Sequence, residues 1–396
     1  MRLTYEQLDK IKAKHNVDTL WSFSRFDTYR TSKWEYLLKY ILKVKENNEK
    51  VSGYSHLGTA CHELVQDTYE GKKKFEDLRD EFDDIWTTNI EIAGLYFDRT
   101  DSTKDENIKA KYYKDLIHFF ENYKILPYKM LNEQALTIKI SDDIVFIGYA
   151  DSIYKNENDE YVIVDYKTSS RYSSKSLRDH SAQLVLYCEG LRQMGIPKEK
   201  IKCCFSFLKY VDIDCEQVNG KIKTRSIERH EIGEALQASC KVWLKKLGYE
   251  DKLVEYLDEL AQTNDIKCLP EDVQTKYVIR DAETYIDDIW EFYEELREEI
   301  ISTIAEINEK TEQYNLLKNT DIESAEQLFW DDDESLKAQS YYYNNLCGYS
   351  IPTIKPYKNW LDRINAEKSG DIFGNKPTQT SDTDDDDDMS WLNELA

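Results

Sequence analysis

The chain has 396 residues, 40% of them hydrophobic and 33% charged, so it is long enough to bury the core of one large domain or two smaller ones. No apolar run approaches the roughly 18 to 20 residues of a membrane span, and the start MRLTYEQLDKIKAKH lacks the apolar core of a signal peptide. A cytoplasmic protein without a membrane partner is therefore expected. The eight cysteines contain no CxxC pair, which argues against a disulfide framework and a zinc ribbon.

Charge is distributed unevenly along the chain. The net charge is -24, which by itself disfavours a polyanionic partner. Residues 381–396, however, hold six Asp and one Glu with no Lys or Arg, whereas residues 161–230 have a net charge of +5. An acidic protein of this kind can still carry a basic groove.

The pattern of apolar residues changes period along the first half of the chain. Residues 4–47 predict two short helices with a break near Asp18, and residues 57–126 predict mostly helix because apolar side chains recur at about 3.6-residue spacing. The segments ALTIKI, IVFIGYADSIY and EYVIVDYKT instead alternate and are rich in β-branched residues, with polar turns between them. They predict an antiparallel meander.

The second half returns to helix with one further strand. The segment SLRDHSAQLVLYCEGLRQMG predicts a helix, and KIKCCFSFLKYVDI predicts the strand that follows it. Residues 276–318 predict one long acidic amphipathic helix, and residues 366–390 have the composition of disorder. The expected parts are an N-terminal helical part, a core, a C-terminal helical part packing on that core, and a disordered acidic tail: 1–126, 127–275, 276–365 and 366–396.

Three charged side chains occupy the predicted strand ends. Asp151 ends one strand, and Asp165 and Lys167 are two residues apart on the next, so these two share a face of the sheet. Two carboxylates suit a hard cation such as Mg²⁺ or Mn²⁺, and a lysine beside them can orient an attacking water or stabilise phosphate charge. The set predicts phosphodiester hydrolysis. Taken singly, Asp151 can cap a turn, and Asp165 with Lys167 can be a structural ion pair.

The order of the motifs resembles that of the PD-(D/E)XK nucleases of the RecB, AddB and Cas4 type. The stretches that carry the resemblance are LGTACHELV, similar to the family's G-x-x-x-H helix, then GYAD, VDYK and AQLVLY, the last similar to its Q-x-x-x-Y element. The resemblance extends from about Ser22 to Gly190. It implies an α/β fold with a restriction-endonuclease-like core, in which helices flank a mixed central sheet, with helical additions at both ends.

The resemblance also implies roles for individual residues. Metal ligands for Mg²⁺ or Mn²⁺ are expected from three side chains and one backbone carbonyl: His62, Asp151, Asp165 and the carbonyl of Tyr166. Lys167 takes the place of the catalytic lysine. Gln183 and Tyr187 are expected to support the site or to contact substrate, and they complete the expected catalytic set with Lys167 and the two acids.

The sequence departs from many members of this family at the iron–sulfur cluster. Those relatives hold the cluster with one early and three late cysteines, but the early position here reads Ser32-Lys33 and the late region keeps Cys347 alone. No cluster is therefore expected, and packing of the C-terminal segment on the N-terminal helices is expected in its place. The chain has no GxxxxGK[ST] phosphate loop either, so ATP-driven translocation is not expected from it.

The resemblance implies a DNA nuclease that is an exonuclease or is directed to single strands or flaps, acting in replication, recombination or repair. Basic residues that can line a path for the phosphate backbone are Lys167, Arg171, Lys175 and Arg178, with Tyr172 among them as a stacking surface. The alternative is a protein of the same fold that binds DNA ends or a replisome partner without cutting. A composition rich in Lys, Asn, Tyr and Ile also suggests a phage or mobile-element origin.

The acidic tail DDDDDMSWLNELA has three interpretations. Five consecutive Asp residues are typical of a disordered, solubilising end. Trp391, Leu392 and Leu395, however, follow at helical spacing, which is typical of a short peptide that docks on a partner such as a replication or recombination protein. The tail can also fold back on the basic channel and compete with substrate.

Overall fold

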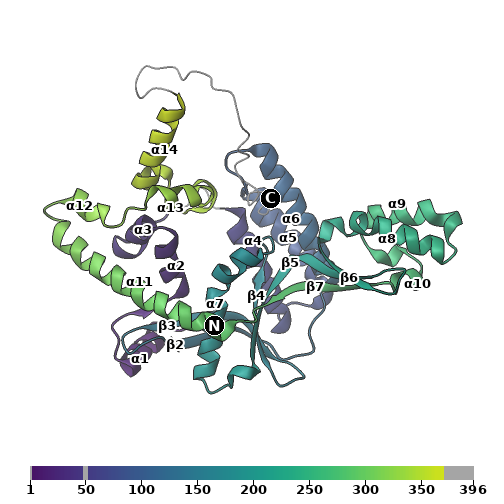
Figure 1. Cartoon of the computed structure of the whole chain (residues 1–396), viewed down its shortest axis with the longest axis horizontal. Coiled ribbons are helices and arrows are strands. Elements are labelled where there is room, and N and C mark those ends of the chain that lie inside the picture. The colour runs from purple at the N-terminus through teal and green to yellow at the C-terminus, as the bar shows by residue number, and fades with distance from the viewer. Residues whose placement is uncertain (1, 48–51, 370–396) are drawn as a thin grey trace.

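A mixed seven-stranded sheet forms the centre of the protein in a computed structural model, which describes residues 2–47 and 52–369 (Figure 1). The strands are β1 (Leu20–Trp21), β2 (Leu131–Lys139), β3 (Val145–Lys155), β4 (Tyr161–Lys167), β5 (Ile201–Glu216), β6 (Ile222–Glu228) and β7 (Tyr277–Tyr285). The predicted antiparallel meander is confirmed as β2, β3 and β4. The predicted helix and the strand after it are also confirmed, as α7 (Ser174–Gln193) and β5, which runs parallel to β4.

Helices cover both faces of this sheet. Successive side chains of a strand point to opposite faces, so each strand contributes residues to two different cores. On β4, Val162, Val164 and Tyr166 pack with α4 (Gly53–Tyr69), α5 (Leu78–Trp86) and α6 (Ser102–Asn122). Ile163 points the other way, into the core formed with α7, α2 (Phe23–Thr31) and α11 (Ile289–Leu317). Asp165 and Lys167 share the face of Ile163. None of the described helices is long and apolar enough to span a membrane.

A third core lies in an arm that extends to the right in Figure 1. The outer half of β5 continues past a bulge between Phe207 and Val211 and pairs there with β6 and β7. The arm's helices are α8 (Ile232–Lys246), α9 (Leu253–Thr263) and α10 (Glu271–Gln274). Apart from Tyr277 and Ile279 of β7, this separate cluster lies inside the range 127–275 predicted as nuclease core.

The helix predicted over 276–318 is wrong in its first part. Residues Tyr277–Tyr285 form β7, which pairs antiparallel with β5, and α11 begins only at Ile289. The stretch YVIRDAETY is rich in aromatic and β-branched residues, and its partner β5 lies about 70 residues earlier, so pairing outweighs the acidic helical pattern. The predicted disorder also begins too early, since 366–369 belong to α14 (Lys355–Ser369); residues 370–396 lie outside the described residues.

The C-terminal segment packs on the N-terminal helices at a hydrogen-bonded junction. Asp331 precedes α13 (Asp333–Ala338), and its carboxylate accepts hydrogen bonds at the start of α3 (Lys33–Tyr36). The donors are Ser32 Oγ at 3.0 Å, Lys33 N at 2.8 Å, Trp34 N at 3.4 Å and Tyr343 Oη at 3.3 Å. The expected packing of these segments is thus confirmed, with Ser32 in a carboxylate-centred contact.

A second contact completes the junction beside Cys347. The hydroxyl of Tyr342 donates to Glu35 at 2.7 Å, and the buried Cys347 thiol lies 3.8 Å from the same carboxylate. All eight cysteines are free thiols. Helices α12 (Ile322–Gln327), α13 and α14 lie next to α2 and α3 in Figure 1 and bring residues 331–347 to this place.

Substitution of Asp331 by alanine should destabilise the protein, because four donors lose a charged acceptor. We expect Asp331→Ala to lower the free energy of unfolding by about 2 kcal/mol in urea denaturation. Glu334→Ala is the matched control: this exposed acid lies three residues further on and should change stability by less than about 0.5 kcal/mol. Equal stability of the two variants would contradict the proposed importance of the junction.

Candidate active site

The two acids and the lysine of the sequence motifs meet where β3 and β4 diverge. In the antiparallel pair, Ser152 lies opposite Val164, so Asp151 and Asp165 are neighbours across the ladder. Lys167 Nζ lies 2.6 Å from Asp165 Oδ2, and the Tyr166 backbone N–H donates to Asp151 Oδ2 at 3.3 Å. All three side chains are partly buried.

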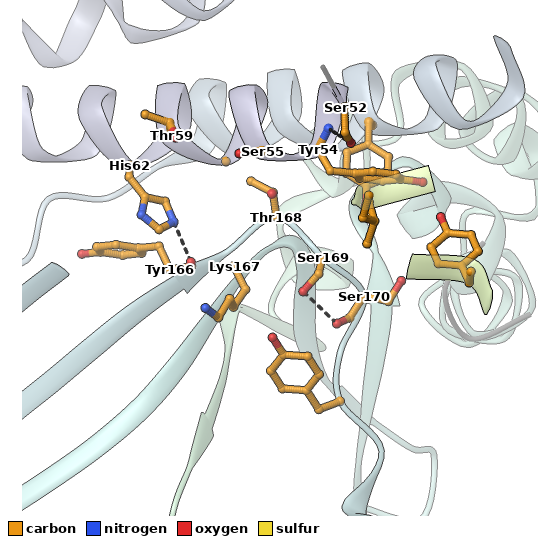
Figure 2. A pocket seen from close by; sticks show the side chains of 15 residues that line it. Ser52, Tyr54, Ser55, Thr59, His62, Tyr166, Lys167, Thr168, Ser169 and Ser170 are labelled. Atoms are coloured by element: carbon orange, nitrogen blue, oxygen red, sulfur yellow. Dashed lines mark hydrogen bonds between the residues drawn. The ribbon is translucent and has the colours of Figure 1, made fainter. Parts of the chain in front are cut away.

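Helix α4 brings His62 to the same place from the other layer. Its Nε2 lies 2.6 Å from the carbonyl oxygen of Tyr166, and its Nδ1 lies 3.3 Å from Asp151 Oδ2. Figure 2 shows the imidazole between α4 and the end of β4, pointing at that carbonyl. The structure therefore brings together His62, Asp151, Asp165, Tyr166 and Lys167, which lie far apart in the chain.

The electrostatics of this group follow from burial and from the closeness of the two acids. Burial, and then the neighbouring Asp165 carboxylate, raise the pKa of Asp151 well above its usual range. Burial lowers the pKa of Lys167, but Asp165 outweighs this effect and the net result is a raised pKa. Burial also lowers the pKa of His62, which keeps the imidazole neutral and able to act as a ligand.

The donor set fits a divalent cation. Two carboxylates and one backbone carbonyl offer the oxygen donors that hard cations prefer, and one neutral imidazole adds a nitrogen donor. A cation between the acids also relieves the repulsion that raises the pKa of Asp151. The side-chain ligand atoms of His62, Asp151 and Asp165 do not all lie within 4.8 Å of one another, and the Tyr166 carbonyl oxygen lies 2.6 Å from His62 Nε2.

Gln183 and Tyr187 lie one turn apart on α7 and contact each other. Gln183 Nε2 donates to Tyr187 Oη at 2.6 Å. Burial raises the pKa of Tyr187 to about 12, so its hydroxyl stays protonated at neutral pH. The Tyr187 ring lies against Gly148 of β3, where an added Cβ would be only 2.2 Å from the ring. This contact lets the ring support the strand that carries Asp151.

A cavity of about 520 Å³ opens beside Lys167 and His62, between α4 and the segment that follows β4. Ser55, Thr59 and His62, spaced four and three residues apart, face it from α4, and Thr168, Ser169 and Ser170 face it from below (Figure 2). Tyr341 and Leu346 of the C-terminal part also line it. Apart from His62 and Lys167, sequence reasoning missed the residues named here. The hydroxyls of Ser55 and Thr59 share one face of α4 with His62, and this spacing was a usable signal.

The basic residues predicted to form a DNA path are mostly engaged in ion pairs. Arg171 Nη1 lies 2.6 Å from Asp212, and Arg178 lies 2.7 Å from Asp288 and 2.6 Å from Glu295. Lys167 and Tyr172 do line the cavity. Lys175 belongs to the first turn of α7.

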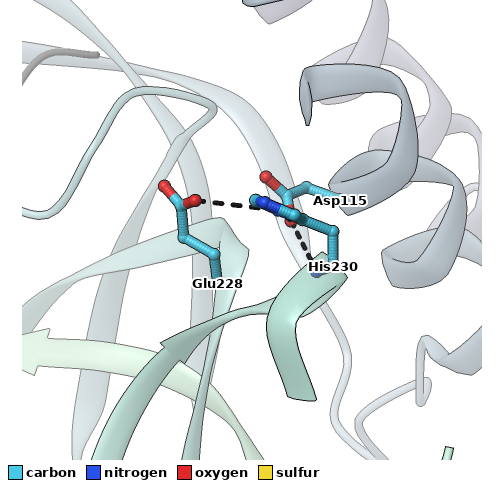
Figure 3. A group of neighbouring side chains, drawn as sticks. All are labelled: Asp115, Glu228 and His230. Carbon is cyan, nitrogen blue, oxygen red and sulfur yellow. Dashed lines mark hydrogen bonds and ion pairs between the residues drawn. The ribbon is translucent and has the colours of Figure 1, made fainter. Parts of the chain in front are cut away.

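A second charged cluster joins α6 to the start of α8 (Figure 3). In the described ranges, Asp115, Glu228 and His230 are the set of three acidic or histidine side chains whose ligand atoms all lie within 4.8 Å. The ring Nδ1 and backbone N–H of His230 both lie 2.8 Å from Asp115 Oδ1. The buried Lys209 contributes a positive charge near both acids. Ion pairing therefore already explains this cluster without a metal.

The packing of Tyr187 on Gly148 predicts a steric effect. We expect Gly148→Ala to lower the free energy of unfolding by about 1–3 kcal/mol, because the new methyl group displaces the ring. Adding Tyr187→Leu to this variant should recover part of the loss, since the substitution removes the ring. Gly58→Ala is the control: its Cβ would meet only Thr168 Oγ1 at 3.6 Å, and a helical alanine should not destabilise the protein. Similar losses in both alanine variants would refute the steric account.

The His230–Asp115 pair predicts a pH-dependent contribution to stability. The hydrogen bond to Asp115 raises the pKa of His230, and Glu228 and Glu231 also face the ring. The protonated ring therefore stabilises the fold fully below the unfolded pKa of about 6.5, and this stabilisation is lost as pH rises through the folded pKa.

Urea denaturation of wild type and His230→Asn across pH 5.5–9, in EDTA so that no ion holds the ring deprotonated, measures this contribution. The stability difference between the two proteins should shrink as pH rises. A difference that stays constant or grows would contradict the pairing.

Three matches relate this chain to known proteins. The family model of the PD-(D/E)XK nuclease superfamily matches residues 20–314. A curated relative, which is a subunit of an ATP-dependent helicase/deoxyribonuclease of Clostridium novyi (strain NT), is 22% identical over 287 residues, which are 65% of this chain and 25% of that protein. A solved structure, "Crystal structure of SSO0001", matches with 14% identity, a TM-score of 0.18, and coverage of 50% of this chain and 75% of the other. The chain thus spans about a quarter of the curated relative it matches, and it belongs to the PD-(D/E)XK nuclease superfamily.

Proposed function

We propose that this protein is a divalent-metal-dependent DNA nuclease that acts in DNA repair or recombination. The observation that carries the proposal is the convergence of Asp151, Asp165, Lys167 and His62 at the edge of a cavity, in a chain of this superfamily. The name of the curated relative includes a deoxyribonuclease, which supports DNA as the substrate. Mg²⁺ and Mn²⁺ are the proposed ions, because the donors are mainly oxygen atoms.

Each residue has a role in this proposal. The carboxylates of Asp151 and Asp165, the Tyr166 carbonyl and neutral His62 hold the ion. A divalent ion bound there supplies Lewis-acid activation of the phosphodiester and of water. Lys167 stays cationic at neutral pH, because Asp165 raises its pKa. It therefore acts by stabilising negative charge on the phosphate or by orienting water through hydrogen bonds, and not by removing a proton.

Gln183 and Tyr187 act as positioning residues. Their mutual hydrogen bond and the contact of Tyr187 with Gly148 hold β3 against α7, so that Asp151 keeps its place beside Asp165. Neither residue belongs to the lining of the cavity beside Lys167. We therefore assign them to support of the site and not to direct contact with DNA.

The finer parts of the proposal concern substrate form and partners. A single strand, an end or a flap suits a cavity of about 520 Å³ better than an intact duplex does. A replication or recombination protein that docks on Trp391, Leu392 and Leu395 also remains a proposal, since these residues lie outside the described part of the chain.

Substitution of Lys167 or Asp165 tests the nuclease directly. On end-labelled DNA with Mg²⁺ or Mn²⁺, we expect Lys167→Ala and Asp165→Asn each to lower kcat by about 10²-fold or more, because each removes charge at the reacting phosphate. EDTA should abolish cleavage by the wild type.

Lys155→Ala and Asp159→Asn are the matched controls. These two residues form an exposed ion pair at the far end of the same hairpin, and their variants should cleave like the wild type. A wild type that binds DNA but never cuts it would favour the non-catalytic alternative. Equal cleavage by Lys167→Ala and wild type would refute the assigned site.

A further inference from the structure

We infer that the cavity beside Lys167 binds one unpaired nucleoside of a DNA strand and so sets the preference of the enzyme for unpaired DNA. The inference rests on the proposed nuclease function. The cavity adjoins Lys167 and His62 at one end, so a nucleoside inside it has its phosphate next to the proposed metal ligands.

The chemistry of the lining fits a nucleoside better than a run of phosphates. Serine and threonine hydroxyls from α4 and from 168–170 contribute hydrogen-bonding groups, and several tyrosines contribute aromatic faces. Among the described residues that line the cavity, Lys167 is the one lysine or arginine. Binding a phosphate backbone requires cations along its path, whereas a neutral base stacks on aromatic rings and a sugar accepts hydroxyl contacts.

The aromatic end of the cavity is held firmly in shape. The Tyr54 ring lies 5.5 Å from Tyr112 and 4.8 Å from Phe97, both edge to face. Phe97 and Tyr112 are buried, and Tyr112 is further contacted by Lys209, whose Nζ lies 3.8 Å from its ring centroid. Rings fixed by their neighbours lose little entropy when a base stacks on them, which favours binding.

The size of the cavity excludes an intact duplex. A volume of about 520 Å³ falls in the range that holds one small molecule. A stacked base pair cannot enter such a space, and a nucleotide of a duplex must first leave the stack, at a cost of a few kcal/mol. Unpaired strands avoid this cost, so the cavity discriminates against duplex DNA.

The C-terminal part completes the cavity wall. Tyr341 and Leu346 line it, and they flank or lie in the π-helical turn Tyr342–Leu346. Glu35 and Asp331 accept hydrogen bonds from the hydroxyls of Tyr342 and Tyr343 and so hold this turn on the N-terminal helices. The junction therefore fixes a wall of the substrate site.

The test compares a substrate that has a base with one that has none. The probes are a single-stranded oligonucleotide and bis(p-nitrophenyl) phosphate, both assayed with Mn²⁺ and the full chain. We expect Tyr341→Ala to lower the ratio of kcat/KM for the oligonucleotide to kcat/KM for the small ester by about tenfold, since stacking of one base is lost. Tyr5→Ala, at a tyrosine that is 88% exposed on α1 (Tyr5–His15), is the control and should keep the wild-type ratio.

A second variant tests the same ratio independently, in case the first variant misfolds. Ser55 is exposed on α4, so Ser55→Leu should fold and should fill the cavity, again lowering the ratio. An unchanged ratio in both variants, with an active wild type, would overturn the nucleoside site and leave the nuclease intact. Loss on both substrates in equal proportion would also overturn it. A wild type without metal-dependent activity on either probe would instead overturn the proposed function.

Discussion

The closeness of two carboxylates between the layers of the protein is the constraint on which the rest of the structure depends. Burial and the charge of Asp165 raise the pKa of Asp151, so the pair is unfavourable as two bare anions. Lys167 offsets part of that charge at 2.6 Å, and in the proposed function a divalent cation would offset the rest. The register of β3 and β4 imposes this arrangement, because it places the two acids side by side where the strands diverge.

The surrounding layers hold this pair and form the cavity beside it. From one face α4 contributes His62 and the hydroxyls of the cavity, and from the other α7 contributes Tyr187, whose ring requires the absence of a side chain at Gly148. The C-terminal part does not form a separate unit, since β7 joins the sheet and Tyr341 reaches the cavity. Stability at the Asp331 junction and the shape of the cavity are therefore linked.

The sequence predicted those features that local pattern determines. Alternation placed Asp165 and Lys167 on one face of β4, and helical spacing placed Gln183 beside Tyr187, so these positions followed from a few neighbouring residues. Pairing between distant segments was not predictable in this way. The strand β7 was mistaken for helix because its partner is remote, and Asp212 and Asp288, which neutralise Arg171 and Arg178, lie 41 and 110 residues from them. Tyr341 gave no local signal at all.

Calorimetric titration of Mn²⁺ into the full chain tests most directly the claim that the motif carboxylates, and not the Asp115–Glu228–His230 cluster, hold the catalytic cation. The comparison requires wild type, Asp165→Asn and Glu228→Gln. We predict that wild type and Glu228→Gln bind the ion alike, whereas Asp165→Asn loses the binding. Unchanged binding in Asp165→Asn, or its loss in Glu228→Gln alone, would contradict this claim.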